Sequence, residues 1–385
     1  MVNKKISILC LHLSYGGIEQ SCINIANMLS EKYNVELVSF YKIDNQIPYY
    51  INSKVNILYL SDLKPNKDKI KLYQEEKKII KLCLEIFKAI KIIYKKRTYM
   101  KKYLRKTNSD IVISSRIYYT KILNKSKKNI IKIAQEHCHH NNNQKYIKKL
   151  KKSCSNIDYM INVSEELNND YTKEKFNLKI QNIFIPNSLE KVEYPISNLK
   201  NKKISMVGRL SPEKGFLDAI SVFNEFEKRN PGWQLNIIGD GEEKIKIKES
   251  IKNYNLENKV ILHGFRKKDY IYKSNSESSI FLMTSYEESF GMVLIEAAAS
   301  GLPLISYDSA QGAKEIIEEN KNGYLIKNRN PEEMINKIEE LIQNEKKINA
   351  FSKKSIEISK KYKYKEIQKK WFDLIETIIS KEVNK

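Results

Sequence analysis

Several residue types are scarce in this chain, and their scarcity narrows its chemistry. Its 385 residues include five histidines and five cysteines, and no two cysteines form a C-x-x-C pair. An odd number of cysteines without paired spacing indicates free thiols in a reducing compartment. No apolar run approaches the ~18 residues that a membrane span requires, and the apolar stretch 6–13 fits a buried strand better than a signal peptide. We therefore expect a cytoplasmic protein.

Arginine is also rare, and the basic charge is unevenly distributed. Only seven of the 69 basic residues are arginine, and the formal net charge is +23. Residues 1–200 carry a net charge of +19 and residues 201–385 only +4, and most of the excess lies in residues 64–152. A basic first half indicates an anionic partner: a membrane surface, a phosphorylated substrate or nucleic acid.

Short apolar runs alternate with helical patterns along the whole chain. Strands are expected at residues 4–13, 34–40, 110–114, 129–135, 157–163, 180–186, 203–208, 234–239, 259–264, 279–285 and 302–306. This alternation predicts parallel sheets covered by helices. A polar segment with a proline, residues 190–201, separates the halves. We predict an α/β fold of two doubly wound, Rossmann-like domains, 1–195 and 196–385, with a cleft at the carboxyl ends of their strands.

The segment "GRLSPEKGF", residues 208–216, follows one of these strands and precedes a helix. It places Arg209 and Lys214 around a turn that ends in Gly215. A pyrophosphate at such a turn would meet backbone N–H groups, the positive end of a helix and two cations. The alternative is an ordinary charged surface loop.

A second segment, "SYEESFGMVLIEAAASGLP", carries two glutamates at residues 288 and 296. Glu296 sits in an apolar helical stretch, where a carboxylate is costly unless donors reach its oxygens. The two hydroxyls of a ribose would supply such donors. Glu288 is expected two turns earlier, near the start of the same helix. The alternatives are a buried salt bridge for Glu296 and a favourable helix-terminal charge for Glu288.

Two further candidates lie in the first half. Gly16 and Gly17 follow the first strand and open a helix, so that backbone N–H groups could approach an anion closely. The segment "EHCHH" holds His137, His139 and His140. Contiguous His-Cys-His-His lacks a second ligand group at zinc spacing, so a histidine directed into the cleft is favoured over a metal site.

Together these segments resemble the retaining GT-B glycosyltransferases of the family 4 type, over nearly the whole chain. "GGIEQSCINIANML" is similar to the family's first loop and helix, and "VGRLSPEKGF" to its phosphate loop. "IIGDGEE" and "LHGF" resemble the next two strand-end turns, and "EESFGMVLIEAAASGLPLIS" resembles its two-glutamate segment. The phosphate loop and the two-glutamate segment are the specific matches. We also expect the C-terminal helix to return to the first domain.

The resemblance assigns expected roles to individual residues. It implies that Arg209 and Lys214 hold the donor pyrophosphate, Glu296 the ribose, and Glu288 the sugar ring. His137 is implied to contact the transferred sugar near C6, which makes His137, Arg209, Lys214 and Glu288 the expected catalytic set. The remaining expected donor-binding residues are Gly16, Gly17, Gly239, Gly264, Phe265, Ser289, Phe290 and Gly291. Gln20 stands where family members often carry a cation, so no phosphate contact is assigned to it.

No D-x-D motif occurs in the chain, so a metal-held diphosphate is not expected, nor is any other cofactor. Arg209 and Lys214 would instead neutralise the leaving nucleoside diphosphate. The resemblance implies a front-face displacement with retention of configuration. It also implies an acceptor-binding first domain and a donor-binding second domain.

The leading hypothesis is an enzyme that moves a sugar from a nucleotide diphosphate donor, such as a UDP-sugar, to a lipid-linked or surface-polysaccharide acceptor. A nucleotide-sugar epimerase or a glycan phosphorylase of the same architecture is the nearest alternative. A nucleic-acid-binding protein is a more distant one, motivated by the basic half and 24 tyrosines. No nucleic-acid module is recognisable, so we expect no nucleic-acid partner.

Residues 75–106 predict one or two strongly basic helices. Apolar residues recur there at helical spacing, at Ile79, Leu82, Ile86, Ile90 and Ile93. We expect this segment to dock the protein on an anionic bilayer, at the inner face of the plasma membrane. The alternative is that the apolar stripe packs on the sheet while the lysines face water.

Overall fold

The chain divides into two compact units. The structure is a computed structural model that describes residues 4–43, 47–126, 129–138, 140, 143–173 and 180–383. Unit 1 comprises Met1–Ile185 and Gln368–Lys385, and unit 2 comprises Pro186–Ile367. Residues 190–201, at which we expected the boundary, therefore lie inside unit 2.

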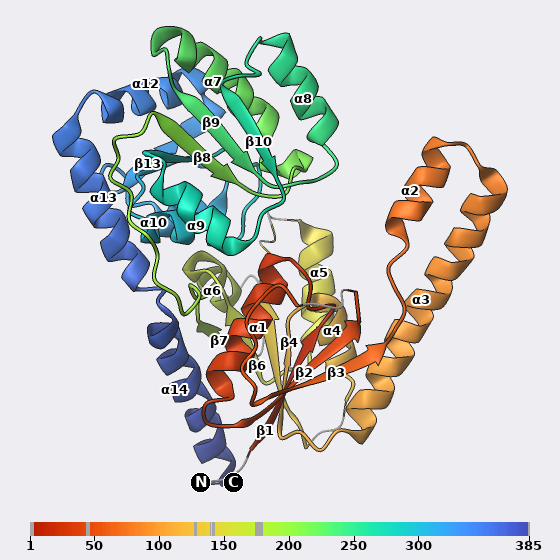
Figure 1. Ribbon diagram of the computed structural model, residues 1–385. Helices are drawn as coiled ribbons and strands as arrows, with labels where there is room; N and C mark the ends of the chain where they lie inside the picture. Colours follow the sequence, from red (N-terminus) through yellow and green to blue (C-terminus); the bar gives the residue numbers. More distant parts are fainter. Residues whose placement is uncertain are drawn as a thin grey trace. The chain divides into compact units, whose positions relative to one another are not determined.

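Unit 1 is built on a seven-stranded parallel sheet in the order β3-β2-β1-β4-β5-β6-β7 (Figure 1). Its strands are β1 (Lys5–Cys10), β2 (Asn34–Tyr41), β3 (Val55–Ser61), β4 (Ile111–Ser114), β5 (Ile131–Glu136), β6 (Tyr159–Asn162) and β7 (Gln181–Phe184). The strand order reverses between β1 and β4. Ligands of such sheets bind outside the carboxyl ends of the strands at this point.

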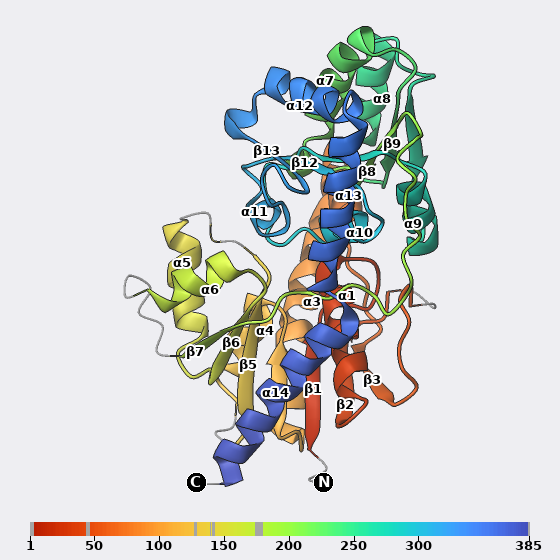
Figure 2. The same ribbon diagram turned by 90° about the vertical axis from the view of Figure 1, so that its left-hand side faces the viewer.

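Helices connect the strands of unit 1 and cover its sheet. They are α1 (Gly17–Leu29), α2 (Lys67–Glu75), α3 (Ile79–Lys106), α4 (Ile117–Leu123), α5 (Gln144–Ser153), α6 (Glu165–Thr172) and the C-terminal part of α14 (Tyr364–Val383). Gln368 of α14 donates from Nε2 to the carbonyl oxygen of Met28 in α1 (3.2 Å), and Trp371 is buried. Figures 1 and 2 both show this part of α14 beside α1. The expected return of the C-terminal helix to the first domain is confirmed.

Unit 2 holds a six-stranded parallel sheet in the order β10-β9-β8-β11-β12-β13. Its strands are β8 (Lys203–Val207), β9 (Gln234–Ile238), β10 (Val260–Gly264), β11 (Ile280–Met283), β12 (Leu304–Tyr307) and β13 (Gly323–Ile326). Its helices are α7 (Phe216–Arg229), α8 (Lys244–Asn253), α9 (Lys268–Ser276), α10 (Met292–Ala299), α11 (Gln311–Ile316), α12 (Pro331–Ile342) and α13 (Glu345–Lys360), with short 3-10 turns η1 (Pro212–Lys214) and η2 (Lys327–Arg329). Here the strand order reverses between β8 and β11.

Both sheets confirm the predicted fold class of two doubly wound α/β domains. The inner strands β4, β11 and β12 are buried at every residue, as expected for parallel strands covered on both faces. The sequence analysis missed β3 and β13. β3 is an edge strand with a largely exposed surface, and β13 has only four residues and begins with a glycine.

No helix in the part of the chain that the structure describes is both long enough and apolar enough to cross a bilayer.

Candidate functional site

The two loops at the switch point of unit 2 lie against each other. The loop after β8 contains Gly215, whose φ of 64° falls in the left-handed region. A Cβ there would overlap the carbonyl oxygen of Thr284, at the end of β11. The Thr284 hydroxyl in turn donates to the Gly215 carbonyl oxygen (2.7 Å). Because only glycine combines this φ with so close an approach, Gly215 fixes the phosphate loop against the loop after β11.

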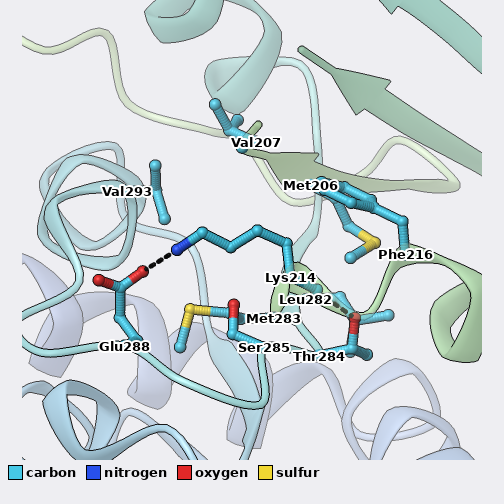
Figure 3. A pocket seen from close by; sticks show the side chains of 11 residues that line it. Met206, Val207, Lys214, Phe216, Leu282, Met283, Thr284, Ser285, Glu288 and Val293 are labelled. Carbon is cyan, nitrogen blue, oxygen red and sulfur yellow. Dashed lines mark hydrogen bonds and ion pairs between the residues drawn. The ribbon is translucent and has the colours of Figure 1, made fainter. Parts of the chain in front are cut away.

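Lys214 and Glu288 meet across these two loops. Lys214 Nζ lies 2.7 Å from Glu288 Oε2, and both side chains are about one-fifth exposed. Figure 3 shows the lysine reaching between Val293 and Met283 toward the carboxylate. A cavity of about 50 Å³ is lined by both side chains and by Gly208 and Ser285. The structure thus brings together a cation and a carboxylate that the sequence assigned to the same site.

Arg209 lies in the same loop as Lys214. Its side chain is 71% exposed, and its guanidinium donates to Glu213 Oε1 (2.6 Å) within the same loop. Ser211 Oγ also donates to this carboxylate oxygen (2.7 Å). The guanidinium is therefore accessible to an incoming phosphate, which would compete with Glu213 for it.

Glu296 is the most deeply buried carboxylate of the site. Its side chain in α10 is 1% exposed, and Lys268, at the start of α9, forms an ion pair with Oε1. The second oxygen, Oε2, has no hydrogen-bond partner among the described residues. The buried salt bridge weighed as an alternative therefore exists, but it satisfies only one of the two oxygens. A buried polar atom without a partner carries a desolvation cost that a ligand donor would remove.

The placement of Glu288 in a helix was wrong. α10 begins at Met292, and Gly291 precedes it with a φ of 92°, so Glu288 lies in the loop before the helix. This loop also contains Ser289 and Phe290. Phe290 is buried and packs against Tyr362 at a ring distance of 5.6 Å, so only its backbone could meet a donor.

The other expected donor-binding residues of unit 2 lie at neighbouring strand ends. Gly239 follows β9, and a Cβ there would overlap the Gly208 carbonyl oxygen, so this glycine allows the two strand ends to approach. Gly264 ends β10 with a φ of 68°. Phe265, the next residue, is half-exposed. All of these positions lie at the carboxyl edge of the sheet.

The switch point of unit 1 carries a separate group of polar residues. Gly16 donates its N–H to the Tyr49 hydroxyl (3.1 Å), and Gly17 opens α1. Glu19, in the first turn of α1, forms an ion pair with Arg116, which follows β4. Arg116 Nε is buried without a hydrogen-bond partner among the described residues. A cation, Arg116, therefore lies at this edge of the sheet. The first loop has Gln20 at the position where members of the resembled family often carry a cation.

His137 follows β5 in unit 1. The residue is buried, and its Nε2 has no hydrogen-bond partner in the described part of the chain. Burial, with a further contribution from Arg116, lowers the pKa of His137 to about 3, so the imidazole is neutral at physiological pH. A neutral imidazole can donate or accept a hydrogen bond but carries no charge.

The structure describes one of the other two histidines of this segment. His140 Nε2 lies 3.1 Å from Asp170 Oδ2, and His139 lies outside the described residues. Within the described ranges, no group of three or more His, Cys, Asp or Glu side chains has metal-binding geometry. The expectation that no metal takes part stays a prediction.

Sequence reasoning missed three charged residues: Lys268 and Arg329 in unit 2, and Arg116 in the separate group of unit 1. Arg329 donates to the carbonyl oxygens of Thr284 (2.9 Å) and Ser285 (3.1 Å), and it stacks 3.6 Å from the ring centre of Tyr286. It therefore holds the loop after β11 in place. Their only signal in the sequence is that Arg116 and Arg329 belong to the seven arginines.

Comparison with known proteins shows what the chain resembles. Residues 190–358 match the family model "Glycosyl transferases group 1". An uncharacterized glycosyltransferase of Haemophilus influenzae is 29% identical over 376 residues, covering 96% of this chain and 99% of that protein. The amylovoran biosynthesis glycosyltransferase AmsD of Erwinia amylovora is 27% identical over 375 residues, covering 94% of this chain and 96% of that protein.

Solved structures show the same fold. A crystal structure of a point mutant of S. aureus TarM, in complex with fondaparinux, alpha-GlcNAc-glycerol and UDP, superposes with a TM-score of 0.78 at 19% identity. The match covers 96% of this chain and 99% of that one. Residues 190–358 therefore resemble the glycosyl transferases group 1, and the chain as a whole resembles these two glycosyltransferases in sequence and TarM in fold.

Proposed function

We propose that the chain transfers a sugar from a nucleotide diphosphate donor, a UDP-sugar in the first instance, to a polysaccharide or lipid-linked acceptor with retention of configuration. The observation that carries the proposal is the buried Oε2 of Glu296, which has no hydrogen-bond partner among the described residues. It stands on the helix that follows the two-loop site of Lys214 and Glu288. A ribose hydroxyl would supply the missing donor, and a pyrophosphate would use the nearby cations.

The proposed donor contacts follow from the ion pairs of unit 2. Arg209 and Lys214 hold the pyrophosphate. The pyrophosphate displaces Glu213 from the guanidinium of Arg209 and Glu288 from the ammonium of Lys214. Each exchange replaces one charge-assisted hydrogen bond by another, so binding leaves neither of these two cations unpaired. Glu288, released from Lys214, then faces the hydroxyls of the sugar. Lys268 keeps Oε1 of Glu296 occupied and so directs Oε2 to the ribose.

The proposed reaction needs no protein nucleophile. The acceptor hydroxyl oxygen bonds to the anomeric carbon while the bond from that carbon to the donor phosphate oxygen breaks. The acceptor proton passes to the leaving phosphate oxygen, on the same face of the sugar. Negative charge grows on the diphosphate as the bond breaks, and Arg209 and Lys214 stabilise it at that stage. From unit 1, neutral His137 is proposed to contact the transferred sugar.

The acceptor class rests on the relatives. The Erwinia amylovora protein is named for amylovoran biosynthesis, and it matches this chain over nearly the full length of both. We therefore propose a surface polysaccharide or its lipid-linked precursor as acceptor, bound by unit 1, with unit 2 as the donor-binding domain.

A panel of UDP-, GDP- and ADP-sugars in a thermal-shift assay tests this function. The correct donor at 100 times its Kd should stabilise the fold by about 2.7 kcal/mol. Release of the nucleoside diphosphate should then require an acceptor glycan. Release or isomerisation without an acceptor would indicate the epimerase alternative, and stabilisation by none of the donors would contradict a nucleotide-sugar enzyme.

A further inference from the structure

Helices α2 and α3 form an arm that is attached to unit 1 at one end only. The C-terminal half of α3 is fixed to the sheet, where Met100 and Leu104 are buried. The Tyr103 hydroxyl lies 2.6 Å from Ser7 Oγ of β1 and donates to Glu36 of β2. Toward its N-terminus α3 extends away from the sheet of unit 1 with α2 folded back along it (Figure 1).

One side of this arm is packed and the other carries exposed apolar side chains. Asn66, directly before α2, donates from Nδ2 to the carbonyl oxygen and to Oε2 of Glu85 (both 2.8 Å), so α2 covers the side of α3 that bears Glu85. On other sides of α3, Ile80 is 79% exposed and Phe87 is 71% exposed. The exposed apolar face comprises Ile79, Ile80, Leu84, Ile86, Phe87, Ile90 and Ile93. The expected stripe therefore does not pack on the sheet; of its five residues only Leu82 is not exposed.

Basic residues border this apolar face. Residues 67–106 contain 15 basic and four acidic residues. At 100° per residue, Lys81 and Lys95 lie along one edge of the apolar face of α3, and Lys91 lies near that edge, between Ile80 and Leu84. A contiguous exposed apolar patch that is bordered by polar residues is typical of an interaction site. A second copy of the arm is a poor partner, because two arms of the same strong positive charge repel each other.

We propose that the arm is a membrane-docking element that inserts the apolar face of α3 into the interface of an anionic bilayer. The helix places its apolar residues at the boundary of headgroups and acyl chains, and its lysines contact the anionic headgroups. The charge complementarity selects an anionic lipid surface over a neutral one. This docking is independent of the proposed reaction, and it would hold the enzyme at the surface where a lipid-linked acceptor lies.

Vesicle co-sedimentation of the full-length protein tests the proposal without donor or acceptor, so its outcome does not depend on the proposed function. The vesicles contain phosphatidylcholine alone or mixed with phosphatidylglycerol, at low and at high salt. Wild-type protein should bind the mixed vesicles, and binding should weaken at high salt. Ile80→Ser with Phe87→Ser should abolish binding at both salt concentrations. Lys81→Gln, Lys91→Gln and Lys95→Gln together should weaken low-salt binding by at least about tenfold, since each lysine contributes up to roughly fivefold. The Lys88–Glu85 ion pair (2.7 Å) is left intact in this variant.

A matched control comes from α8, which also presents an exposed isoleucine and lysines. Ile245→Ser with Lys248→Gln and Lys252→Gln should leave vesicle binding unchanged. Equal binding of the control and the arm variants would overturn the proposal, as would equal binding to neutral vesicles or no binding to either kind. Sedimentation velocity gives the oligomeric state of each variant. An oligomer that the Ile80→Ser, Phe87→Ser variant dissociates, without vesicle binding by wild type, would assign the face to a second copy instead.

Discussion

Lys214 and Glu288 lie 2.7 Å apart across the loops that follow β8 and β11, and this ion pair joins the phosphate loop to the two-glutamate segment. The two residues are 74 positions apart in the chain, and the reversal of strand order between β8 and β11 brings them together. The pair marks the switch point of unit 2 as the site where charge is concentrated.

Removing a cation of the phosphate loop should slow the chemical step. Arg209→Ala or Lys214→Ala loses a charge-assisted contact to the donor phosphate, worth about 1.5–3 kcal/mol, or roughly 10- to 150-fold in rate. The loss should appear in kcat more than in KM, because charge on the phosphate grows as the bond breaks. Steady-state kinetics measure it. Arg229→Ala is the matched control, since Arg229, at the end of α7, forms its ion pair with Glu332 of α12. Wild-type turnover by folded Arg209→Ala would remove it from the mechanism.

Changing His137 should impair transfer and leave the fold intact. His137→Ala removes a neutral imidazole whose Nε2 is available for a sugar hydroxyl, at a cost of about 0.5–1.5 kcal/mol for one hydrogen bond. His137→Asn keeps a donor of similar reach and should recover part of the rate. Measuring the transfer rate and the melting temperature together separates a role in binding the sugar from a role in stabilising the fold. Loss of stability without a change in rate would make His137 a structural residue.

Chelation should have no effect on transfer. We predict that cations of the protein, and not a metal ion, neutralise the leaving diphosphate. The rate after dialysis against EDTA should equal the rate before it, and added Mg²⁺ or Mn²⁺ should not raise it. Stoichiometric metal in the purified protein, or a rate that only a metal restores, would show that this prediction is wrong.

Glu136 should make stability depend on pH. Burial raises the pKa of Glu136 to about 7, and this effect outweighs the hydrogen bonds that its carboxyl group receives from Cys138 N–H (2.9 Å) and Tyr146 Oη (3.0 Å). The folded state therefore binds this proton more tightly than the unfolded state does. The stabilisation is present below the ordinary glutamate pKa and is lost as pH rises through about 7.

The matched variant is Glu136→Gln, which can keep both hydrogen bonds and has no proton to lose. Its stability should exceed that of wild type by up to about 3 kcal/mol at pH 8, and the difference should shrink toward pH 5. Urea unfolding at several pH values measures the difference. A difference that does not change with pH would contradict the raised pKa of this buried carboxyl group. Burial lowers the pKa of His137, so His137 lowers the stability as pH falls in the acid range, opposite to Glu136. Because both proteins contain His137, their difference in stability isolates the contribution of the Glu136 carboxyl group.

The fold could be predicted from the sequence because each inner strand is an apolar run bounded by a helical pattern. The phosphate loop was found for a related reason: Arg209 and Lys214 lie within a few residues of a strand end, so their neighbourhood is set by local geometry. The prediction that Glu288 lies in a helix was wrong. A helical pattern in the sequence does not reveal that Gly291 adopts a left-handed φ, and α10 begins only after it.

The partners of the buried charges could not be predicted. Lys268 reaches Glu296 from the helix after β10, and Arg116 reaches Glu19 from the end of β4. Such pairs depend on which strands lie side by side, and one sequence with many lysines does not distinguish among them. The sequence could not predict whether the apolar face of α3 is exposed either, since helical spacing alone fits both packing on a sheet and docking on a membrane.

Titration calorimetry of UDP against three variants tests the central claim most directly. Glu296→Ala should weaken UDP binding by roughly 10- to 150-fold, because the carboxylate that binds the ribose is lost. Glu288→Ala should bind UDP nearly as wild type does and lose transfer, since it faces the sugar that UDP lacks. Glu225→Ala, a surface glutamate paired with Lys228, should change neither. Wild-type affinity for UDP in folded Glu296→Ala would contradict the proposed donor site.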